Sequence, residues 1–274
     1  MLRNLGPGDL PLLRALIAHD PLVNLFVEYR VEATQLQPRW LGGNIWGYFD
    51  DGELVSACHA AANLVPVEAT PDAIVAFAEH ALRTGMNCSS IVGLDSSVLG
   101  LWTILEPHWG PARSPRPVQP FMVIDRDSEL EPDPRVRRVV MDEFDLIYPA
   151  CVAMFTEEVG LDPEGSGKTG YRARVAQLIS QGWSFAIIED NDVLFKAEIG
   201  AATARGCQIQ GVYVRPDLRG RGVAAHAMAA VVKQARSQIA PNVTLYLNDH
   251  NVAARRTYDR VGFRQTATFA TILL

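Results

Sequence analysis

One stretch of the sequence constrains the fold more than any other: residues 212–224, which read VYVRPDLRGRGVA. A short apolar run ends at a proline, a loop with two glycines and two arginines follows, and an alanine-rich pattern begins. This order indicates a β-strand, a loop and the start of a helix. The N–H groups at a helix start lack partners, and glycine lets an anion approach them closely. The stretch therefore predicts a pyrophosphate site.

The same stretch resembles the Arg/Gln-x-x-Gly-x-Gly/Ala signature of the GNAT superfamily of N-acetyltransferases, whose loop holds the pyrophosphate of acetyl-CoA. Here the signature falls on residues 219–224, and a Val-x-Val-x-Pro run precedes it. A later GNAT motif, Asn-x-x-Ala-x-x-x-Tyr-x-x-x-Gly-Phe, is matched by Asn251, Ala254, Tyr258, Gly262 and Phe263. The resemblance runs from Arg135 to the C-terminus and implies the GNAT fold there.

Composition excludes several classes of protein. A chain of 274 residues with 48% hydrophobic residues is long and apolar enough for one large or two ordinary domains. A net charge of −6 argues against a general nucleic-acid binder. The four cysteines are widely spaced and form no Cys-x-x-Cys pair, so we expect no metal and a reducing, cytoplasmic location. No signal peptide or membrane-spanning run is recognisable.

The chain divides where proline and acidic residues gather. Four prolines lie within residues 111–120, and residues 125–134 are acidic and contain two more prolines. A proline-rich and acidic sequence without apolar periodicity is typical of a linker. We predict an N-terminal domain over 1–127, a linker over 128–134 and a GNAT domain over 135–274. The second half shows the order β-α-α-β-β-β-α-β-α-β, with a final strand from Ala267.

The first half shows a similar order of elements, without repeating the residue identities. We predict a degenerate copy of the same fold, and thus an α/β protein (an α+β mixed sheet) with a tandem GNAT-like acyl-CoA N-acyltransferase fold. An unrelated α/β cap is the alternative. The segment at the phosphate-loop position, residues 65–70, contains no glycine, and Glu68 would repel a pyrophosphate. We therefore expect no CoA site in the first half.

The GNAT resemblance implies roles for particular residues. In the family, the pantetheine arm pairs with the edge of the strand before the loop, here Val212 to Val214, and the backbone N–H of Val212 would polarise the thioester carbonyl. Tyr258 would protonate, or hydrogen-bond, the departing thiolate, since a phenol is neutral at pH 7; the alternative is a helix tyrosine packed on the sheet. The implied contacts to acetyl-CoA are Val212, Tyr213, Val214, Arg219, Gly220, Arg221, Gly222, Val223, Ala224 and Asn251, the last of which is equally a helix cap.

The general base is harder to assign. Some GNAT enzymes carry a glutamate on the strand before the loop, where this chain has Gln208 and Gln210, and an amide is not a useful base. Glu198 on the preceding strand is our candidate, acting through a water molecule. The alternatives are a structural role for Glu198, an acceptor amine that needs no base, or another base, namely Glu157, Glu158 or His250.

A second glycine-rich segment, residues 165–169, looks like a nucleotide P-loop. The pattern requires a glycine where Asp162 stands, and a strand rather than a helix before it. We instead expect residues 160–170 to form a loop that shapes the acceptor pocket, in which Lys168 either binds an acidic group or is solvated.

Together these features predict an enzyme that transfers an acetyl group from acetyl-CoA to a primary amine by direct attack in a ternary complex. The acceptor class stays open: a small metabolite, an amino acid, or a peptide or protein amine. The alternative is a catalytically weak CoA-binding sensor or scaffold protein, and a donor longer than acetyl is a third possibility. We expect no nucleic-acid or membrane partner, and a monomer or homodimer.

Overall fold

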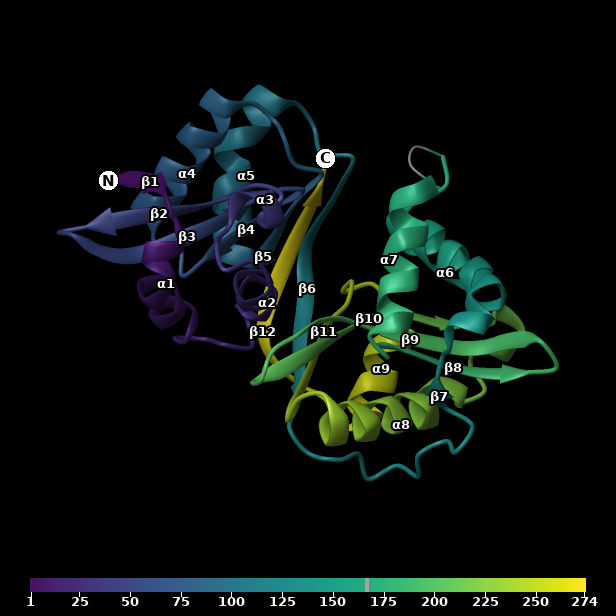
Figure 1. Ribbon diagram of the computed structural model, residues 1–274. Helices are drawn as coiled ribbons and strands as arrows, with labels where there is room; N and C mark the ends of the chain where they lie inside the picture. Colours follow the sequence, from purple (N-terminus) through teal and green to yellow (C-terminus); the bar gives the residue numbers. More distant parts are fainter. Residues whose placement is uncertain (166–167) are drawn as a thin grey trace. The chain divides into compact units, whose positions relative to one another are not determined.

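The computed structural model describes residues 1–165 and 168–274. The chain forms two compact units (Figure 1). Unit 1 comprises Met1–Met122, Tyr246–His250 and Gln265–Leu274, and unit 2 comprises Val123–Leu245 and Asn251–Arg264. Each unit is a mixed sheet with helices on both faces, which confirms the predicted α/β class. The P-loop-like segment includes residues 166 and 167, which lie outside the described residues.

The sheet of unit 1 has the strand order β1-β2-β3-β4-β5-β12-β6. Strands β1 to β4 pair antiparallel, β4 and β5 pair parallel, and β5 and β12 pair antiparallel. The strands span β1 Leu2–Asn4, β2 Asn44–Asp50, β3 Glu53–Ala60, β4 Asn63–Val67, β5 Ser90–Leu94, β6 Ser114–Ile124 and β12 Arg264–Leu273.

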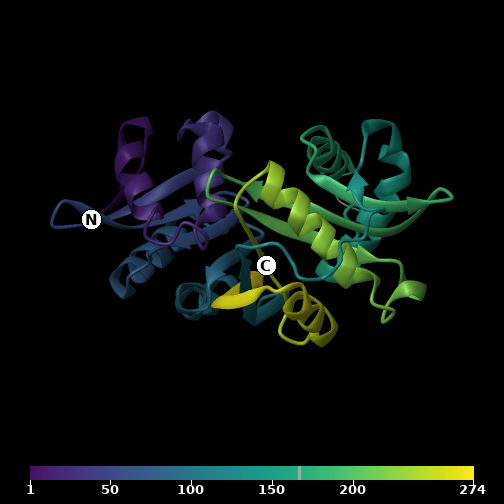
Figure 2. The same cartoon turned by 90° about the horizontal axis from the view of Figure 1, so that it is seen from below.

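Helices cover both faces of this sheet, as Figures 1 and 2 show. One core cluster joins α4 and α5 to the sheet through residues such as Phe77 and Leu101. A second cluster joins α1 and α2 to the other face through residues such as Leu13 and Val27. The helices span α1 Leu10–Ile17, α2 Leu25–Thr34, α3 Pro38–Leu41, α4 Pro71–Thr84 and α5 Asp95–Trp109.

Unit 2 reproduces the element order predicted for the second half, except for the final strand, which lies in unit 1. Its sheet has the order β11-β10-β9-β8-β7, in which β10 and β11 are parallel and the other neighbours are antiparallel. The strands span β7 Arg137–Arg138, β8 Ser184–Glu189, β9 Asp192–Ala202, β10 Gly206–Val214 and β11 Asn242–Tyr246. The β8–β9 hairpin turns at Asp190 and Asn191, both at positive φ.

In unit 2, α6 and α7 lie on one face of the sheet, and α8 lies on the other with α9 beside it (Figure 1). Their spans are α6 Phe144–Val159, α7 Lys168–Ser180, α8 Val223–Gln238 and α9 Val252–Val261. Small residues on α8, among them Ala227 and Ala230, are buried, and they allow the helix to approach the strands closely.

The last strand, β12, belongs to the sheet of unit 1. Residues Phe269–Leu273 pair with Ser90–Leu94 of β5, and Figure 1 shows yellow β12 between β5 and β6. The pattern of side chains predicts a strand here, which we expected to belong to the C-terminal domain. The local sequence pattern cannot predict which strand will pair with β12, because the same alternation of side chains is compatible with more than one sheet.

The proline-rich segment is a strand and not the irregular break that its composition suggested. Strand β6 begins at Ser114 and includes Pro115, Pro117 and Pro120. Residues 125–134 are irregular as expected, yet they are held onto α8 of unit 2: Asp133 N–H donates to the His226 carbonyl at 3.1 Å, and Arg236 donates to the Asp125 carbonyl at 2.9 Å.

Candidate active site

The candidate site begins where two parallel strands of unit 2 part. Strands β10 and β11 are in register only from Gly206–Asn242 to Gln208–Thr244, although β10 continues to Val214. The backbone groups of β10 beyond Gln208 therefore have no ladder partner on that side. An extended ligand segment with amide groups, such as a pantetheine arm, can pair with such an edge as an added strand.

A β-bulge lies within this free edge. Gln210 pairs with Glu198 and Tyr213 pairs with Lys196, so Gly211 and Val212 together oppose one residue of β9. Gly211 has φ +60°, and an added Cβ would lie 2.9 Å from Glu198 Oε2, so both conformation and space require glycine. A bulge turns backbone groups out of the regular ladder. This is the position at which we predicted the N–H of Val212 to polarise a carbonyl.

The glycine loop follows β10 as predicted. Gly220 and Gly222 have φ +73° and +84°, which side chains disfavour, and the space where a Cβ would stand is open at both. Gly222 is the N-cap residue of α8 and has no side chain with which to cap it. The N–H groups of the first turn, at Val223 and Ala224, therefore stay available to an anion, and the exposed Arg221 adds charge.

The Arg219 side chain is already engaged by protein groups, and not only directed at a phosphate position. Its guanidinium makes two hydrogen bonds of 2.8 Å to the Glu157 carboxylate, and its Nε donates to the Val214 carbonyl at 3.0 Å. It also lies over the ring of Tyr213. Arg219 thus connects the loop to α6 and β10, and the bidentate pair accounts for the lowered pKa of Glu157.

Tyr258 and Asn251 lie at the two ends of α9. The Asn251 side chain accepts a hydrogen bond from Ala254 N–H at 3.0 Å, so it caps the helix, one of its two predicted roles. Gly262 ends the helix at φ +108°. Tyr258 is buried, and burial raises its pKa, with the charge of Glu158 adding to the effect. The Tyr258 phenol is therefore neutral and retains its proton at working pH.

Glu198 is nearly buried and lies in a polar cluster inside the unit. Its Oε1 accepts a hydrogen bond of 2.6 Å from Lys196 Nζ and a contact of 3.5 Å from Cys151 Sγ. Lys196 and Cys151 were not predicted as site residues. The available signal was the pair Lys196 and Glu198 in the otherwise apolar run Val193–Ala202, because charged side chains on a buried strand require partners.

The other candidate bases are placed differently. Glu157 pairs with Arg219, and His250 is exposed. Gln210, which stands where some GNAT enzymes carry a glutamate, lies against Gly200. Glu158 stands on the last turn of α6, where its charge raises the pKa of both Tyr258 and Tyr171. Of the acids considered from the sequence, Glu198 is the one whose carboxylate lies against the bulge.

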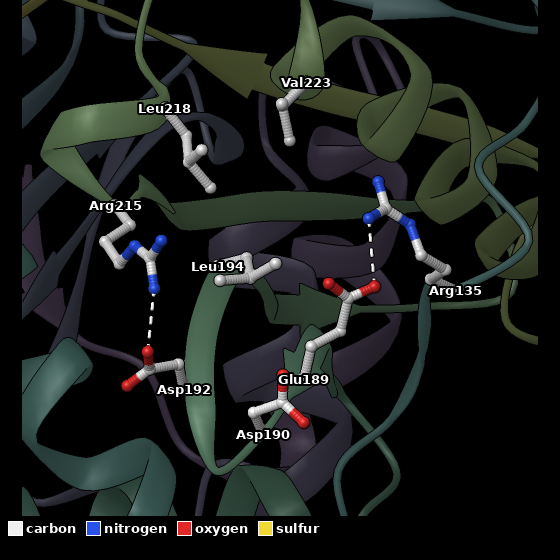
Figure 3. Close-up of a pocket in the computed structure, with 8 residues that line it drawn as sticks. All are labelled: Arg135, Glu189, Asp190, Asp192, Leu194, Arg215, Leu218 and Val223. Atoms are coloured by element: carbon white, nitrogen blue, oxygen red, sulfur yellow. Dashed lines mark hydrogen bonds and ion pairs between the residues drawn. The ribbon is translucent and has the colours of Figure 1, made fainter.

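A pocket with a volume of about 370 Å³ lies next to the loop in unit 2 (Figure 3). Figure 3 shows Arg215 paired with Asp192 and Arg135 paired with Glu189, at 2.9 and 3.0 Å. Both guanidinium groups are thus neutralised by carboxylates. Among the residues that line this pocket, Val223 alone was predicted for the site. We therefore assign the pocket no step in acyl transfer.

Unit 1 differs from unit 2 at the equivalent helix start. Strand β4 is followed by Glu68, Ala69 and Thr70, and Thr70 caps α4 by accepting a hydrogen bond from Ala73 N–H at 3.3 Å. The first residue of α4 is Pro71, which has no N–H to offer. The Glu68 carboxylate, which accepts from Asn24 Nδ2 at 2.9 Å, adds negative charge. This helix start does not suit a pyrophosphate.

Unit 1 also differs from unit 2 at the point where its two parallel strands, β4 and β5, end their pairing. Strands β4 and β5 are in register at Asn63–Ser90 and Leu64–Ile91. Beyond this point β4 carries Pro66, which cannot donate a hydrogen bond to an added strand. A Cβ at Gly93 of β5 would lie 3.6 Å from the Pro66 ring, so the two strands stay close there.

None of the helices in the described part of the chain is long and apolar enough to cross a membrane. Across residues 1–165 and 168–274, no group of three His, Cys, Asp or Glu side chains is arranged to hold a metal ion.

Comparisons with known proteins agree with this geometry. Residues 181–263 match the Acetyltransferase (GNAT) family, and residues 43–147 match a domain of unknown function, DUF4081. The first match contains the bulge, the glycine loop and α9. The match to the GNAT family model therefore lies in the C-terminal part of the chain, and the fold of the whole chain is similar to that of a tandem GNAT protein.

Solved structures show the same fold over the whole chain. A GNAT-family acetyltransferase from Colwellia psychrerythraea has a TM-score of 0.60 at 14% identity, covering 100% of this chain and 99% of that one. A GCN5-related N-acetyltransferase from Sphaerobacter thermophilus has a TM-score of 0.58 at 16% identity, covering 99% and 94%. A tandem GNAT protein from the clavulanic acid biosynthesis pathway has a TM-score of 0.53 at 12% identity, covering 100% and 98%.

Among curated proteins, the chain is similar to a mycothiol acetyltransferase from Brachybacterium faecium. The two are 29% identical over 143 residues, which is 48% of this chain and 43% of that protein. The chain thus matches less than half the length of this relative.

Proposed function

We propose that the protein transfers an acetyl group from acetyl-CoA to a primary amine, and that unit 2 carries the reaction. The observation that carries the proposal is the direct succession of the free edge of β10, the bulge at Gly211–Val212 and the glycine loop. The edge suits the pantetheine arm, the bulge offers a donor for the thioester oxygen, and the loop suits the pyrophosphate.

The chemistry assigns one task to each group. The acceptor nitrogen attacks the thioester carbon while the Val212 N–H stabilises the negative charge that develops on the oxygen. When the tetrahedral intermediate collapses, the C–S bond breaks and Tyr258 gives a proton to the sulfur. Solvent then returns a proton to Tyr258, which balances the proton that the amine has lost. Glu198 accepts the proton lost by the amine, through one water molecule, because its own side chain is nearly buried.

The first test is calorimetric titration with acetyl-CoA. We expect one site per chain, because the helix start in unit 1 is capped by Thr70 and begins with a proline. Two sites per chain would contradict the assignment of unit 1, and no binding would contradict the proposal. Amines are then screened by following free CoA with a thiol reagent. Binding without transfer to any amine would favour the CoA sensor or scaffold.

Replacing Tyr258 with phenylalanine separates catalysis from binding. The variant loses the proton donor for the thiolate, and we expect kcat to fall by about 100-fold, while acetyl-CoA binds as before. Steady-state kinetics and calorimetry measure the two effects. Tyr48→Phe in unit 1, which also removes one tyrosine hydroxyl, is the control and should leave both unchanged. An unchanged kcat in Tyr258→Phe would remove this residue from the mechanism.

A further inference from the structure

A buried lysine stands next to the proposed base. The Lys196 side chain is 0% exposed and that of Glu198 is 5% exposed, and their atoms Nζ and Oε1 are 2.6 Å apart. The two residues are separated by one position on β9, so their side chains lie on the same face of the sheet. A buried ammonium group is costly even when paired, and apolar residues of similar volume are often more stable at such positions. Fold stability alone therefore gives little reason for this lysine.

The two oxygens of the Glu198 carboxylate have different environments. Oε1 receives the Lys196 ammonium and the Cys151 thiol, while Oε2 lies against Gly211 in the bulge. The groups near this carboxylate include Cys151 from α6, Tyr171 from α7 and Lys196 from its own strand. Ser184 is paired with Glu198 on β8, and Gln210 is paired with it on β10. Tyr171 also donates to the Cys151 carbonyl at 2.9 Å, which holds the thiol-bearing turn in place.

We propose that Lys196 is a positioning residue, which with Cys151 holds one oxygen of Glu198 so that the other faces the site of amine attack beside Val212. This inference rests on the proposed function and deepens it. Lys196 does not touch the substrate. It acts by holding the Glu198 carboxylate in a single orientation through the hydrogen bond from Nζ to Oε1.

The charge states of the two donors support this role. Burial by itself lowers the pKa of Lys196, but Glu198 and Cys151 outweigh that effect and raise the pKa above its ordinary value. Lys196 is therefore an ammonium ion throughout the working pH range. Burial raises the pKa of Cys151 to about 12, so this thiol stays neutral and donates rather than reacts.

The test compares the pH–rate profiles of the wild type and Lys196→Met. Without the ammonium, a buried carboxylate takes up a proton more readily. We expect the acidic limb of the profile to move up by about one pH unit and kcat at neutral pH to fall about tenfold, with acetyl-CoA affinity unchanged. Lys233→Met removes an exposed lysine from α8 and is the matched control, with a profile like that of the wild type.

A double-variant cycle shows whether Lys196 acts through Glu198. If it does, Lys196→Met has no further effect on kcat in a Glu198→Gln background. Because Lys196→Met leaves a carboxylate buried and the variant risks misfolding, Cys151→Ala provides a second route. It removes the other donor to Oε1 without leaving a charge unpaired, and kcat should fall by about threefold in the wild type and not in Glu198→Gln.

Independent effects in the cycle, or a Lys196→Met profile that superimposes on that of the wild type, would overturn the inference while the wild type remains an active acetyltransferase. A wild type that binds acetyl-CoA and acetylates no amine would instead contradict the proposed function, and the inference with it. The two failures are distinguished by the activity of the wild-type chain.

Discussion

Replacing Gly222 with glutamate is expected to weaken acetyl-CoA binding by at least about 100-fold, equivalent to roughly 2.7 kcal/mol. Gly222 precedes the first turn of α8, and its φ of +84° is strained for any residue with a side chain. The new carboxylate would also enter the open space above the loop, next to the N–H groups that we assign to the pyrophosphate. Calorimetric titration measures the effect.

The matched control for this variant is Gly42→Glu. Gly42 follows α3 at φ +71° and ψ +20°, in the same left-handed region as Gly222, and the space for its Cβ is open as well. The two variants therefore carry a similar conformational cost, about 1–2 kcal/mol, and the same added charge. They differ in position, since Gly42 lies in unit 1. Acetyl-CoA should bind Gly42→Glu normally, and equal affinity in the two variants would refute the assignment of the loop.

Replacing Phe269 with alanine is expected to lower the free energy of unfolding by about 3–5 kcal/mol, although the residue lies close to the C-terminus. Phe269 is 5% exposed, and its ring centroid is 4.5 Å from that of Phe121 and 5.4 Å from that of Tyr246. Strand β12 also forms five registered pairs with β5, so its loss would expose the middle of the sheet of unit 1.

Urea unfolding followed by tryptophan fluorescence measures this effect, since Trp46 and Trp102 belong to the same core cluster as Ala270 and Ile272 of β12. Thr266→Ala alters an exposed residue of the same strand and should change stability by less than about 0.5 kcal/mol. If Phe269→Ala were equally mild, β12 would not be integral to unit 1.

The candidate site divides into residues that local patterns reveal and residues that they do not. The loop glycines and the ends of α9 were predictable because each requirement is local. A left-handed φ selects glycine at Gly222 and Gly262, and an unpaired helix start selects an asparagine at Asn251. The bulge at Gly211 was not predictable, because its only trace in the sequence is a glycine within a strand. A glycine there can also mark a bend or a close approach of another backbone.

By itself, the sequence determined the order of the elements from Arg137 onward, the glycine loop after β10 and the lack of glycine in residues 65–70, because these depend on neighbours within a few residues. In the first half it did not reveal β1 or β4. The tertiary structure decided the rest. It placed β12 in the sheet of unit 1, turned Arg219 toward Glu157, and set Lys196 and Cys151 on one oxygen of Glu198. These contacts join residues far apart in the chain, and their energies arise from burial and pairing, which no local pattern encodes.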